Sequence, residues 1–229
     1  MSYFKNDDAL SKIIKKIYDA YVAAKSSNDI HSNVIDPFSA LLEASFNEMT
    51  YDEWIVAEES RQVQKTLQNA IGNFHEEIIG EIKGFENLKV GEIIDIVSKD
   101  KKIIAEIKNK WNTTKGNHKV AIYDDIASVL TTIGDGFTGY YVEIVPKKST
   151  PYNKEFTPSD NKTHSQRTAN SKIRVIDGKS FYAMITGDEN AVFKIYDEIV
   201  AELEKLGLNT ENDFKKLLTK AYGEPTQQS

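Results

Sequence analysis

The sequence predicts an α/β (α+β) fold in which a central mixed sheet is flanked by helices and preceded by an N-terminal helical region. Two features indicate this fold class. Apolar residues recur at helical spacing over roughly the first eighty residues, and short Ile-rich runs with strand character follow. A helical segment then separates these runs from the strongly apolar stretch FTGYYVEIV, so strands and helices alternate in the second part of the chain.

The composition is that of a globular protein. The chain has 229 residues, of which 40% are hydrophobic and 28% charged, so it can bury a sizeable core. We expect one domain over residues 1–229, with a helical N-terminal region (1–66), a core (67–196) and C-terminal helices (197–229).

The sequence also excludes several classes of protein. No apolar run approaches the ~18 residues that span a bilayer, and the start MSYFKNDDALSKIIKK lacks the apolar centre of a signal peptide. We therefore expect a cytoplasmic protein. The absence of cysteine excludes disulfides, thiolate zinc sites and cysteine nucleophiles, and the four histidines are scattered. Any metal would be bound by oxygen atoms.

The charge is unevenly distributed along the chain. The net charge of −6 argues against indiscriminate binding of polyanions. Two segments are nevertheless basic: residues 99–119 and 147–174 each contain seven Lys or Arg against two acidic residues. An acidic chain with two basic segments is compatible with a partner that is itself a polyanion.

The N-terminal third is expected to be helical. The first helix covers residues 8–25, where apolar residues recur at helical spacing with charges between them. Asp36 is expected to cap a second helix, which has Pro37 at its first position and runs to about Met49. A further helical pattern begins at TYDEW and continues to about Ile82, and its glycines leave open whether it forms one helix or two.

Strands and helices alternate after this point. GEIIDIV and KIIAEIK, separated by SKDKK, predict a hairpin. A helix over about 118–133 and a strand over 137–145 follow. Residues 146–171 are polar, contain three of the five prolines and predict a long loop of the functional or disordered kind. KIRVI and SFYAMIT indicate another hairpin, although SFYAMIT could begin a helix, and two helices close the chain.

The first hairpin places carboxylates opposite one another. If it turns at Asp100 and Lys101, Asp95 lies opposite Glu106, and Lys108 shares that face because side chains alternate along a strand. Directly opposed like charges destabilise a sheet. The other face of the hairpin is entirely apolar and carries Ile94, Ile96, Ile103, Ala105 and Ile107.

A divalent cation would convert this repulsion into binding. Mg²⁺ prefers carboxylate oxygens, and the main-chain carbonyl after Glu106 could be a further ligand. A bound metal ion acidifies water and stabilises charge on phosphate, and Lys108 could orient that water or neutralise the transition state. Taken alone, the pattern also fits an ordinary solvated strand. The surrounding apolar runs and the basic segment that follows favour phosphodiester hydrolysis.

These residues resemble a known catalytic motif. DIVSKDKKIIAEIKNK resembles the Asp…Glu-x-Lys core of the PD-(D/E)xK nuclease superfamily, with Asp95, Glu106 and Lys108 in the motif positions and Ile94 in place of the leading proline. The ordered set QNAIGNFHEEIIG, NKWNTTKG, YYVEIVPKK and IRVIDGKSFYAMITG resembles one family of type II restriction endonucleases, whose members cut short palindromes of the GG-N-CC kind. The resemblance runs from about Leu67 to Tyr196.

The resemblance implies a fold and an activity. The fold is a PD-(D/E)xK restriction-endonuclease-like core within a single nuclease domain. The activity is Mg²⁺-dependent hydrolysis of double-stranded DNA at a short palindrome, which restricts foreign DNA. In this superfamily a carboxylate from the preceding helix often joins the metal site, and Glu76 and Glu77 are the candidates here. The motif position favours Glu76, whereas the helical wheel leaves Glu77 nearer the edge of the apolar face. We expect His75 to be a packing residue.

Two groups of residues are expected to contact DNA. Donors close to the metal suit backbone phosphates, and they are Asn109, Lys110, Asn112, Thr113, Thr114 and Lys115. Trp111 could equally be a core anchor. The long loop is expected to read bases, with Arg167 and Lys148 as first choices. The residues of this second group are Lys147, Lys148, Tyr152, Asn153, Lys154, Asn161, Gln166 and Arg167.

The expected partners follow from the palindrome. A palindromic site matches a two-fold symmetric protein, so we expect a homodimer whose interface comes from the N-terminal or the C-terminal helices. A cognate DNA methyltransferase is the expected genetic partner. Three alternatives stay open: a repair nuclease or Holliday-junction resolvase, a catalytically silent DNA-binding protein, and an acidic helical interaction protein. The long loop argues against the first, and the intact motif argues against the second.

Overall fold

The chain forms two compact units. The computed structural model describes residues 3–27, 30, 33–88, 93–160 and 165–227. The sheet unit comprises Met1–Ser11 and His75–Ser229, and the helical unit comprises Lys12–Phe74. The expected boundary at residue 66 lies inside a helix of the helical unit, and the single domain expected over 1–229 stays a prediction. None of the described helices has the length and apolarity needed to cross a membrane.

The helical unit begins its helices where the sequence predicts. It contains α2 (Pro37–Phe46), α3 (Tyr51–Gly72) and most of α1 (Ala9–Ser26). Pro37 lies in the first turn of α2, and the carboxylate of Asp36 caps that helix by accepting a hydrogen bond from the Phe38 amide. Thr50 and Glu53 form a reciprocal capping box that fixes the start of α3.

The long helical pattern forms two helices. The first, α3, ends at Gly72, and α4 spans Phe74–Glu81. Gly80 of α4 lies against Asn87, since a Cβ atom at Gly80 would be 2.7 Å from the Asn87 Cβ. The glycine therefore allows α4 to pack closely on the first strand of the sheet.

A six-stranded mixed sheet forms the centre of the sheet unit, as predicted. Its strand order is β1-β2-β3-β4-β6-β5. The pairs β1–β2, β2–β3 and β5–β6 are antiparallel, whereas β3–β4 and β4–β6 are parallel. The strands are β1 (Glu86–Asn87), β2 (Ile96–Ser98), β3 (Ile103–Lys110), β4 (Thr138–Val145), β5 (Asn153–Glu155) and β6 (Ile173–Asp177).

The predicted register of the first hairpin is confirmed. Ile96 pairs with Ala105, and Ser98 pairs with Ile103, so the chain turns at residues 100–101. Gly91 and Glu92, at the start of the expected strand GEIIDIV, lie outside the described residues. Near the turn the hairpin is buried on both faces, because Val97 and Ile104 pack into a core with residues of helix α5 (Gly116–Thr132).

The second predicted hairpin is wrong, and the alternative that SFYAMIT begins a helix is confirmed. KIRVI forms β6, but SFYAMIT belongs to α6 (Gly178–Thr186). The carboxylate of Asp177 accepts hydrogen bonds from the amide and the hydroxyl of Ser180, which caps α6 and ends the strand. The expected loop over 146–171 also contains the short strand β5. The closing helices are α7 (Ala191–Lys205) and α8 (Lys215–Tyr222), the latter preceded by a 3₁₀ turn at Asn212–Phe214.

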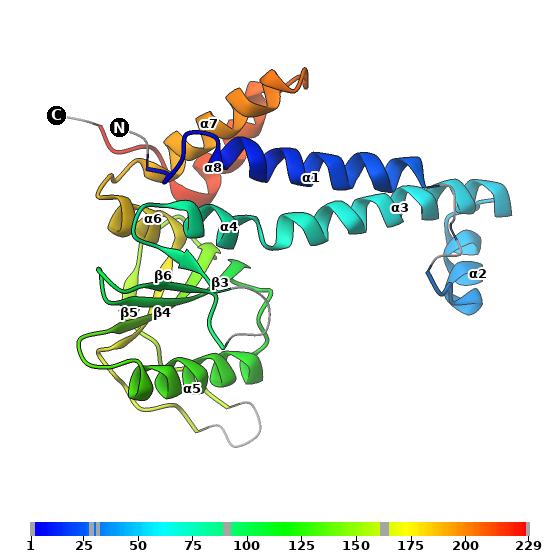
Figure 1. Cartoon of the computed structure of the whole chain (residues 1–229). Coiled ribbons are helices and arrows are strands. Elements are labelled where there is room, and N and C mark those ends of the chain that lie inside the picture. Colours follow the sequence, from blue (N-terminus) through cyan, green and yellow to red (C-terminus); the bar gives the residue numbers. More distant parts are fainter. Residues whose placement is uncertain (1–2, 28–29, 31–32, 89–92, 161–164, 228–229) are drawn as a thin grey trace. The chain divides into compact units, whose positions relative to one another are not determined.

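The sheet is covered on both faces. Figure 1 shows α5 on one face of the sheet and α4 with α6 on the other. On the α5 side, Tyr141 stacks on Phe156 with ring centroids 4.8 Å apart. On the α6 side, Phe181 and Tyr182 are fully buried, and Phe181 lies 6.0 Å from the ring of Tyr140. β3 and β4 are therefore packed between the two layers.

Candidate active site

Polar side chains gather where β3 and β4 end. The strands are parallel, and Glu106 pairs with Tyr141 while Lys108 pairs with Glu143. β3 is fully buried through Ala105 and becomes half-buried at Glu106 and Lys108. The carboxyl edge of the sheet therefore presents charged side chains from a rigid, apolar base.

The three motif residues meet at this edge. The Lys108 Nζ donates a hydrogen bond of 2.6 Å to the Glu106 Oε1 and lies 3.9 Å from the Asp95 Oδ2. The Asp95 Oδ2 also accepts a hydrogen bond of 2.7 Å from the Ile107 amide. Asp95 precedes β2, so this bond anchors its carboxylate to β3. The ammonium between two carboxylates offsets the repulsion that the sequence predicts for the pair.

Burial and neighbouring charges shift the pKa values of the motif residues. The Glu106 side chain is only 15% exposed. Burial and the nearby charge of Asp95 raise the pKa of Glu106 to about 7. Burial opposes the charge on Lys108, but its hydrogen bond to Glu106 and the charges of Glu106 and Asp95 outweigh this effect and raise the pKa of Lys108. The Lys108 ammonium is therefore a stable positive charge among several carboxyl groups.

Helix α4 brings a third carboxylate to the cluster. Burial, followed by the charge of Asp95, raises the pKa of Glu76 to about 7, and Lys108 acts in the opposite direction. Glu76 is thus close enough to feel both motif residues. Next to it, the His75 Nδ1 lies 3.0 Å from the Tyr182 hydroxyl, and burial lowers the pKa of His75 to about 4. The packing role expected for His75 agrees with this contact.

A second polar cluster lies beside the first, and the sequence analysis named only its Tyr152, as a residue expected to contact DNA. Glu143 of β4 is only 8% exposed and accepts hydrogen bonds from the Lys119 Nζ (2.6 Å) and the Tyr152 hydroxyl (2.5 Å). The Tyr152 amide donates to Asp177 of β6. A charged residue inside the apolar stretch FTGYYVEIV was the available signal. Its partners lie 24 and 9 residues away and are brought together only by the fold.

Two buried hydroxyls complete this region. Those of Thr114 and Tyr141 have no well-formed hydrogen bond within the described part of the chain. They are nonetheless close enough to each other to interact, and burial raises the pKa of Tyr141 far above its usual range. The Lys119 Nζ lies 5.3 Å from the Tyr141 ring centroid. Buried polar side chains therefore lie next to the motif cluster, since Tyr141 pairs with Glu106 across the two strands.

Comparison with known proteins decides the family. Residues 1–206 match the model of the Eco47II restriction endonuclease family. The chain belongs to this family. It is 35% identical over 214 residues to the type II restriction enzyme Eco47II of Escherichia coli, covering 89% of this chain and 87% of the relative. It is 34% identical over 194 residues to the type II restriction enzyme Sau96I of Staphylococcus aureus, covering 82% of this chain and 74% of the relative.

Membership of the Eco47II family confirms three predictions. The resemblance to type II restriction endonucleases, the expected enzyme class and the restriction-endonuclease-like fold are correct. The match covers both the helical unit and most of the sheet unit. The motif cluster therefore lies in a chain that matches 87% of one type II restriction enzyme and 74% of another.

The residues expected to contact phosphates lie at the end of β3 and in the turn that leads from β3 to α5. Lys110, Asn112, Thr113 and Lys115 are exposed, whereas Asn109 is half-buried. The Thr113 hydroxyl donates to the Lys110 carbonyl and shapes the turn. Thr114 is only 8% exposed and its hydroxyl is buried, so its side chain faces the interior.

Three of the residues expected to read bases make hydrogen bonds within the protein, whereas Lys148 is exposed. The Arg167 guanidinium binds both carboxylate oxygens of Asp124 on α5, at 2.8 and 2.6 Å. The Gln166 side chain donates to the Thr157 carbonyl. Asn153 accepts two hydrogen bonds from Arg174.

Lysines of the same segment lie over aromatic rings. The Lys147 Nζ is 4.8 Å from the Trp111 ring centroid, and the Lys154 Nζ is 5.9 Å from that of Tyr152. Trp111 thus joins the two segments expected to contact DNA. Asn161 lies outside the described residues.

Proposed function

We propose that the chain is a type II site-specific deoxyribonuclease that uses Mg²⁺ to hydrolyse double-stranded DNA at a short palindrome, with GG-N-CC as the expected kind, and thereby restricts foreign DNA. The observation that carries the proposal is the meeting of Asp95, Glu106 and Lys108 at the carboxyl edge of the sheet in a member of the Eco47II family. Two acids and a lysine on a rigid edge suit attack on a phosphodiester.

The donor set fits a hard divalent cation. As they stand, no three acidic or histidine side chains of the described ranges are grouped tightly enough to hold an ion. Asp95 and Glu106 nevertheless supply carboxylate oxygens, and their mutual repulsion leaves the cluster short of positive charge. Asp95, Glu106 and Glu76 would hold Mg²⁺, and the main-chain carbonyl of residue 107 is a further candidate. The ion would supply an acidified water and neutralise charge on the phosphate.

Lys108, Asp95 and Glu76 have separate roles in the proposed reaction. Once a cation occupies Asp95 and Glu106, the Lys108 ammonium is free to turn toward the attacking water or the phosphate. The bond from the Ile107 amide keeps the Asp95 carboxylate aimed at the edge of β3. Glu76 is the preferred third acid over Glu77, because its pKa responds to Asp95 and Glu106.

DNA contacts are assigned by chemistry and position. We assign phosphate contacts to the turn between β3 and α5 and base contacts to the segment after β4. In the second group Arg167 and Lys148 are the first choices, and Arg167 would exchange Asp124 for a base edge on binding.

The proposed partners and location follow from this activity. The enzyme acts as a homodimer on DNA in the cytoplasm, with a cognate methyltransferase as its genetic partner. A two-fold symmetric protein can cut both strands of a palindrome with identical active sites.

Digestion of fully sequenced phage DNA tests the proposed function. The full-length protein is incubated with the DNA in Mg²⁺ or in EDTA, and the fragment ends are sequenced. We expect discrete Mg²⁺-dependent fragments whose ends share one short palindrome. Random nicking would instead favour a repair or structure-selective nuclease, and DNA binding without cleavage would favour a silent DNA-binding protein.

A further inference from the structure

Helix α2 exposes an apolar face that the helical unit does not cover. No side chain of α2 is buried. Its large apolar residues are strongly exposed, with Phe38 at 77%, Leu41 at 66% and Phe46 at 80%. Because apolar surface is normally removed from water, a helix of this composition indicates a missing partner.

The exposed face continues onto the start of α3. A hollow of about 620 Å³ lies between the two helices and is lined by Leu41, Met49 and Tyr51 among others. Tyr51 is 70% exposed and Met49 is 38% exposed. We define the α2 patch as the exposed large apolar side chains of α2, of the connection that follows it and of the first residue of α3, namely Phe38, Leu41, Leu42, Phe46, Met49 and Tyr51.

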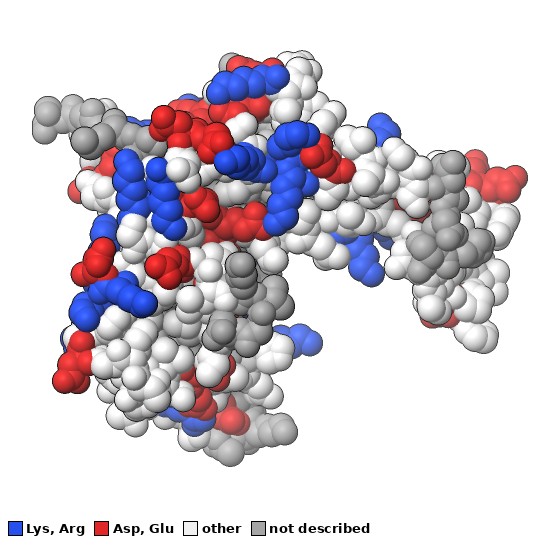
Figure 2. Space-filling model, viewed as in Figure 1, with Lys and Arg blue, Asp and Glu red and all other residues white. Residues whose placement is uncertain are grey.

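The acidic residues around the α2 patch disfavour DNA binding there. Between Lys25 and Arg61 the sequence contains eight Asp or Glu and no Lys or Arg. The one acid within α2, Glu43, already binds the Trp54 indole and the Arg61 guanidinium. Figure 2 shows the visible surface over α2 as mainly uncharged. Nucleic acid binding requires positive charge, so the occupant of the patch is a protein.

The area of the patch suits a stable interface. A large apolar or aromatic side chain presents on the order of 150 to 250 Å² when free. With the exposed fractions of its six members, the α2 patch therefore amounts to roughly 600 Å². This is at the upper limit of ordinary surface patches. It also supplies most of the ~800 Å² that each partner contributes to a standard interface.

We infer that the α2 patch is the surface through which two copies of this chain associate. The inference rests on the proposed function, because cutting both strands of a palindrome calls for two active sites related by a two-fold axis. In such an isologous interface one patch meets itself. The six side chains of the α2 patch carry no charge, so the patch can meet its own copy, and the exposed acids Glu48 and Asp52 lie beside it rather than within it.

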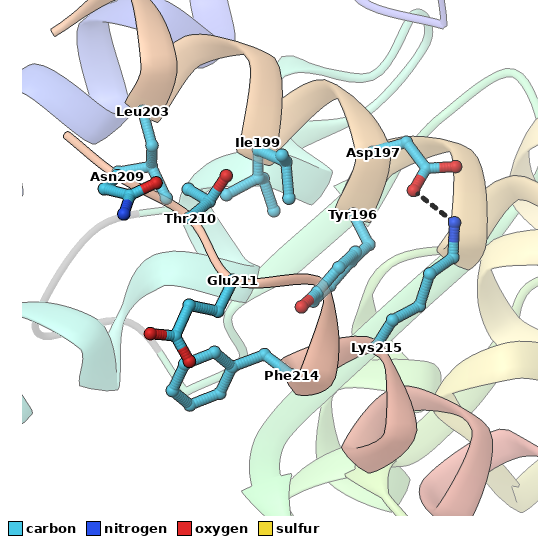
Figure 3. Close-up of a pocket in the computed structure, with 10 residues that line it drawn as sticks. Tyr196, Asp197, Ile199, Leu203, Asn209, Thr210, Glu211, Phe214 and Lys215 are labelled. Carbon is cyan, nitrogen blue, oxygen red and sulfur yellow. Dashed lines mark hydrogen bonds and ion pairs between the residues drawn. The ribbon is translucent and has the colours of Figure 1, made fainter. Parts of the chain in front are cut away.

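The C-terminal helices offer a weaker alternative surface. The hollow between α7 and α8 contains Tyr196, Ile199 and Leu203, but Glu211 and the Asp197–Lys215 ion pair lie along it (Figure 3). Only Phe214 and Leu217 are large, apolar and strongly exposed there among the described residues, at 60% and 61%. This surface is therefore more polar and smaller than the α2 patch, which makes it a matched control.

Sedimentation of the full-length chain without DNA or metal tests the inference. We expect the wild type to be a dimer at micromolar concentration. The double variant Phe38→Lys/Phe46→Lys should weaken dimerisation by at least ~30-fold, with an unchanged circular dichroism spectrum. The control Phe214→Lys/Leu217→Lys adds the same charge and should remain dimeric. A monomeric wild type, or a patch variant that dimerises as tightly as the control, would overturn the inference.

Cysteine labelling separates a second copy from other occupants. Because the chain contains no cysteine, a single Leu42→Cys variant can be joined only to another molecule by a bismaleimide. We expect cross-linked dimers to form much faster with Leu42→Cys than with Leu217→Cys. Equal rates would overturn the inference and indicate that the patch is covered within one chain. Neither measurement involves cleavage, so failure of the interface is distinguishable from failure of the proposed function.

Discussion

At the scale of single residues, Lys108 contacts both acids of the motif. Its Nζ lies 2.6 Å from Glu106 and 3.9 Å from Asp95. The ammonium therefore holds together, in the free protein, the carboxylates that Mg²⁺ would bind in the proposed enzyme. Metal binding and the release of Lys108 toward the phosphate are expected to be coupled.

Replacing Lys108 should separate metal binding from catalysis. We expect Lys108→Met to lower the single-turnover cleavage rate by on the order of 100-fold or more, because a charge that stabilises the transition state is lost. Mn²⁺ affinity, measured by calorimetry, should stay the same or increase, since a competing cation is removed. Lys99→Met, on the exposed hairpin turn, is the control. A large loss of Mn²⁺ affinity in Lys108→Met would contradict this role.

The two glutamates at the start of α4 should differ in effect. Glu76 is influenced by Asp95 and Glu106, so Glu76→Gln should reduce the cleavage rate by at least ~10-fold, a loss typical of groups that tune a metal site. Glu77→Gln should leave the rate near that of the wild type. Parallel rate measurements at saturating Mg²⁺ decide between them, and the reverse order of effects would assign the third acid to Glu77.

At the scale of elements, prediction from sequence succeeded where contacts are local. The hairpin register depends on a turn at Asp100 and Lys101, and both strands lie next to it in the chain. The segment SFYAMIT was left open between strand and helix because its apolar residues fit either period, and the cap at Asp177 decides for a helix. The Glu143–Lys119 pair was missed because the two residues lie on different elements.

The junction between β6 and α6 should tolerate no added volume. A Cβ atom at Gly178 would lie 2.3 Å from the Ile144 carbonyl oxygen of β4. Gly178→Ala must displace backbone, and we expect it to lower the free energy of unfolding by about 1–3 kcal/mol. Gly72→Ala is the control, because nothing lies within 4 Å of that position. Urea unfolding measures both, and equal stabilities would refute the close packing of α6 on β4.

At the scale of the whole molecule, the N-terminal segment is tied to the sheet unit. The Tyr3 hydroxyl donates to Asp188, which also binds Lys194 of α7. Tyr3 and Asp188 lie 185 residues apart in the sequence, so no local pattern could have predicted the contact. The helical unit, whose α2 patch we assign to dimerisation, connects to the sheet unit at residues 11–12 and 74–75.

Acid should weaken the attachment of the N-terminal segment. Hydrogen bonds from Lys194 and Tyr3 lower the pKa of Asp188 from 3.8 to about 2. Because the folded-state pKa is below the unfolded value, this stabilisation is complete above about pH 4. It is lost as pH falls toward 2. The difference in melting temperature between the wild type and Asp188→Asn should therefore be largest above pH 4 and vanish near pH 2. A constant difference across this range would contradict the contact.

The central claim is that the cluster of Asp95, Glu106 and Lys108 is the active site of a restriction enzyme. The most direct test measures cleavage and DNA binding together for Glu106→Gln, with Glu189→Gln, an exposed residue outside the segments assigned to DNA, as the control. We predict that Glu106→Gln cuts no DNA in Mg²⁺ but binds the cleavage site as tightly as the wild type, while the control does both. Cleavage by Glu106→Gln at the wild-type rate would show that the chemistry takes place elsewhere in the chain.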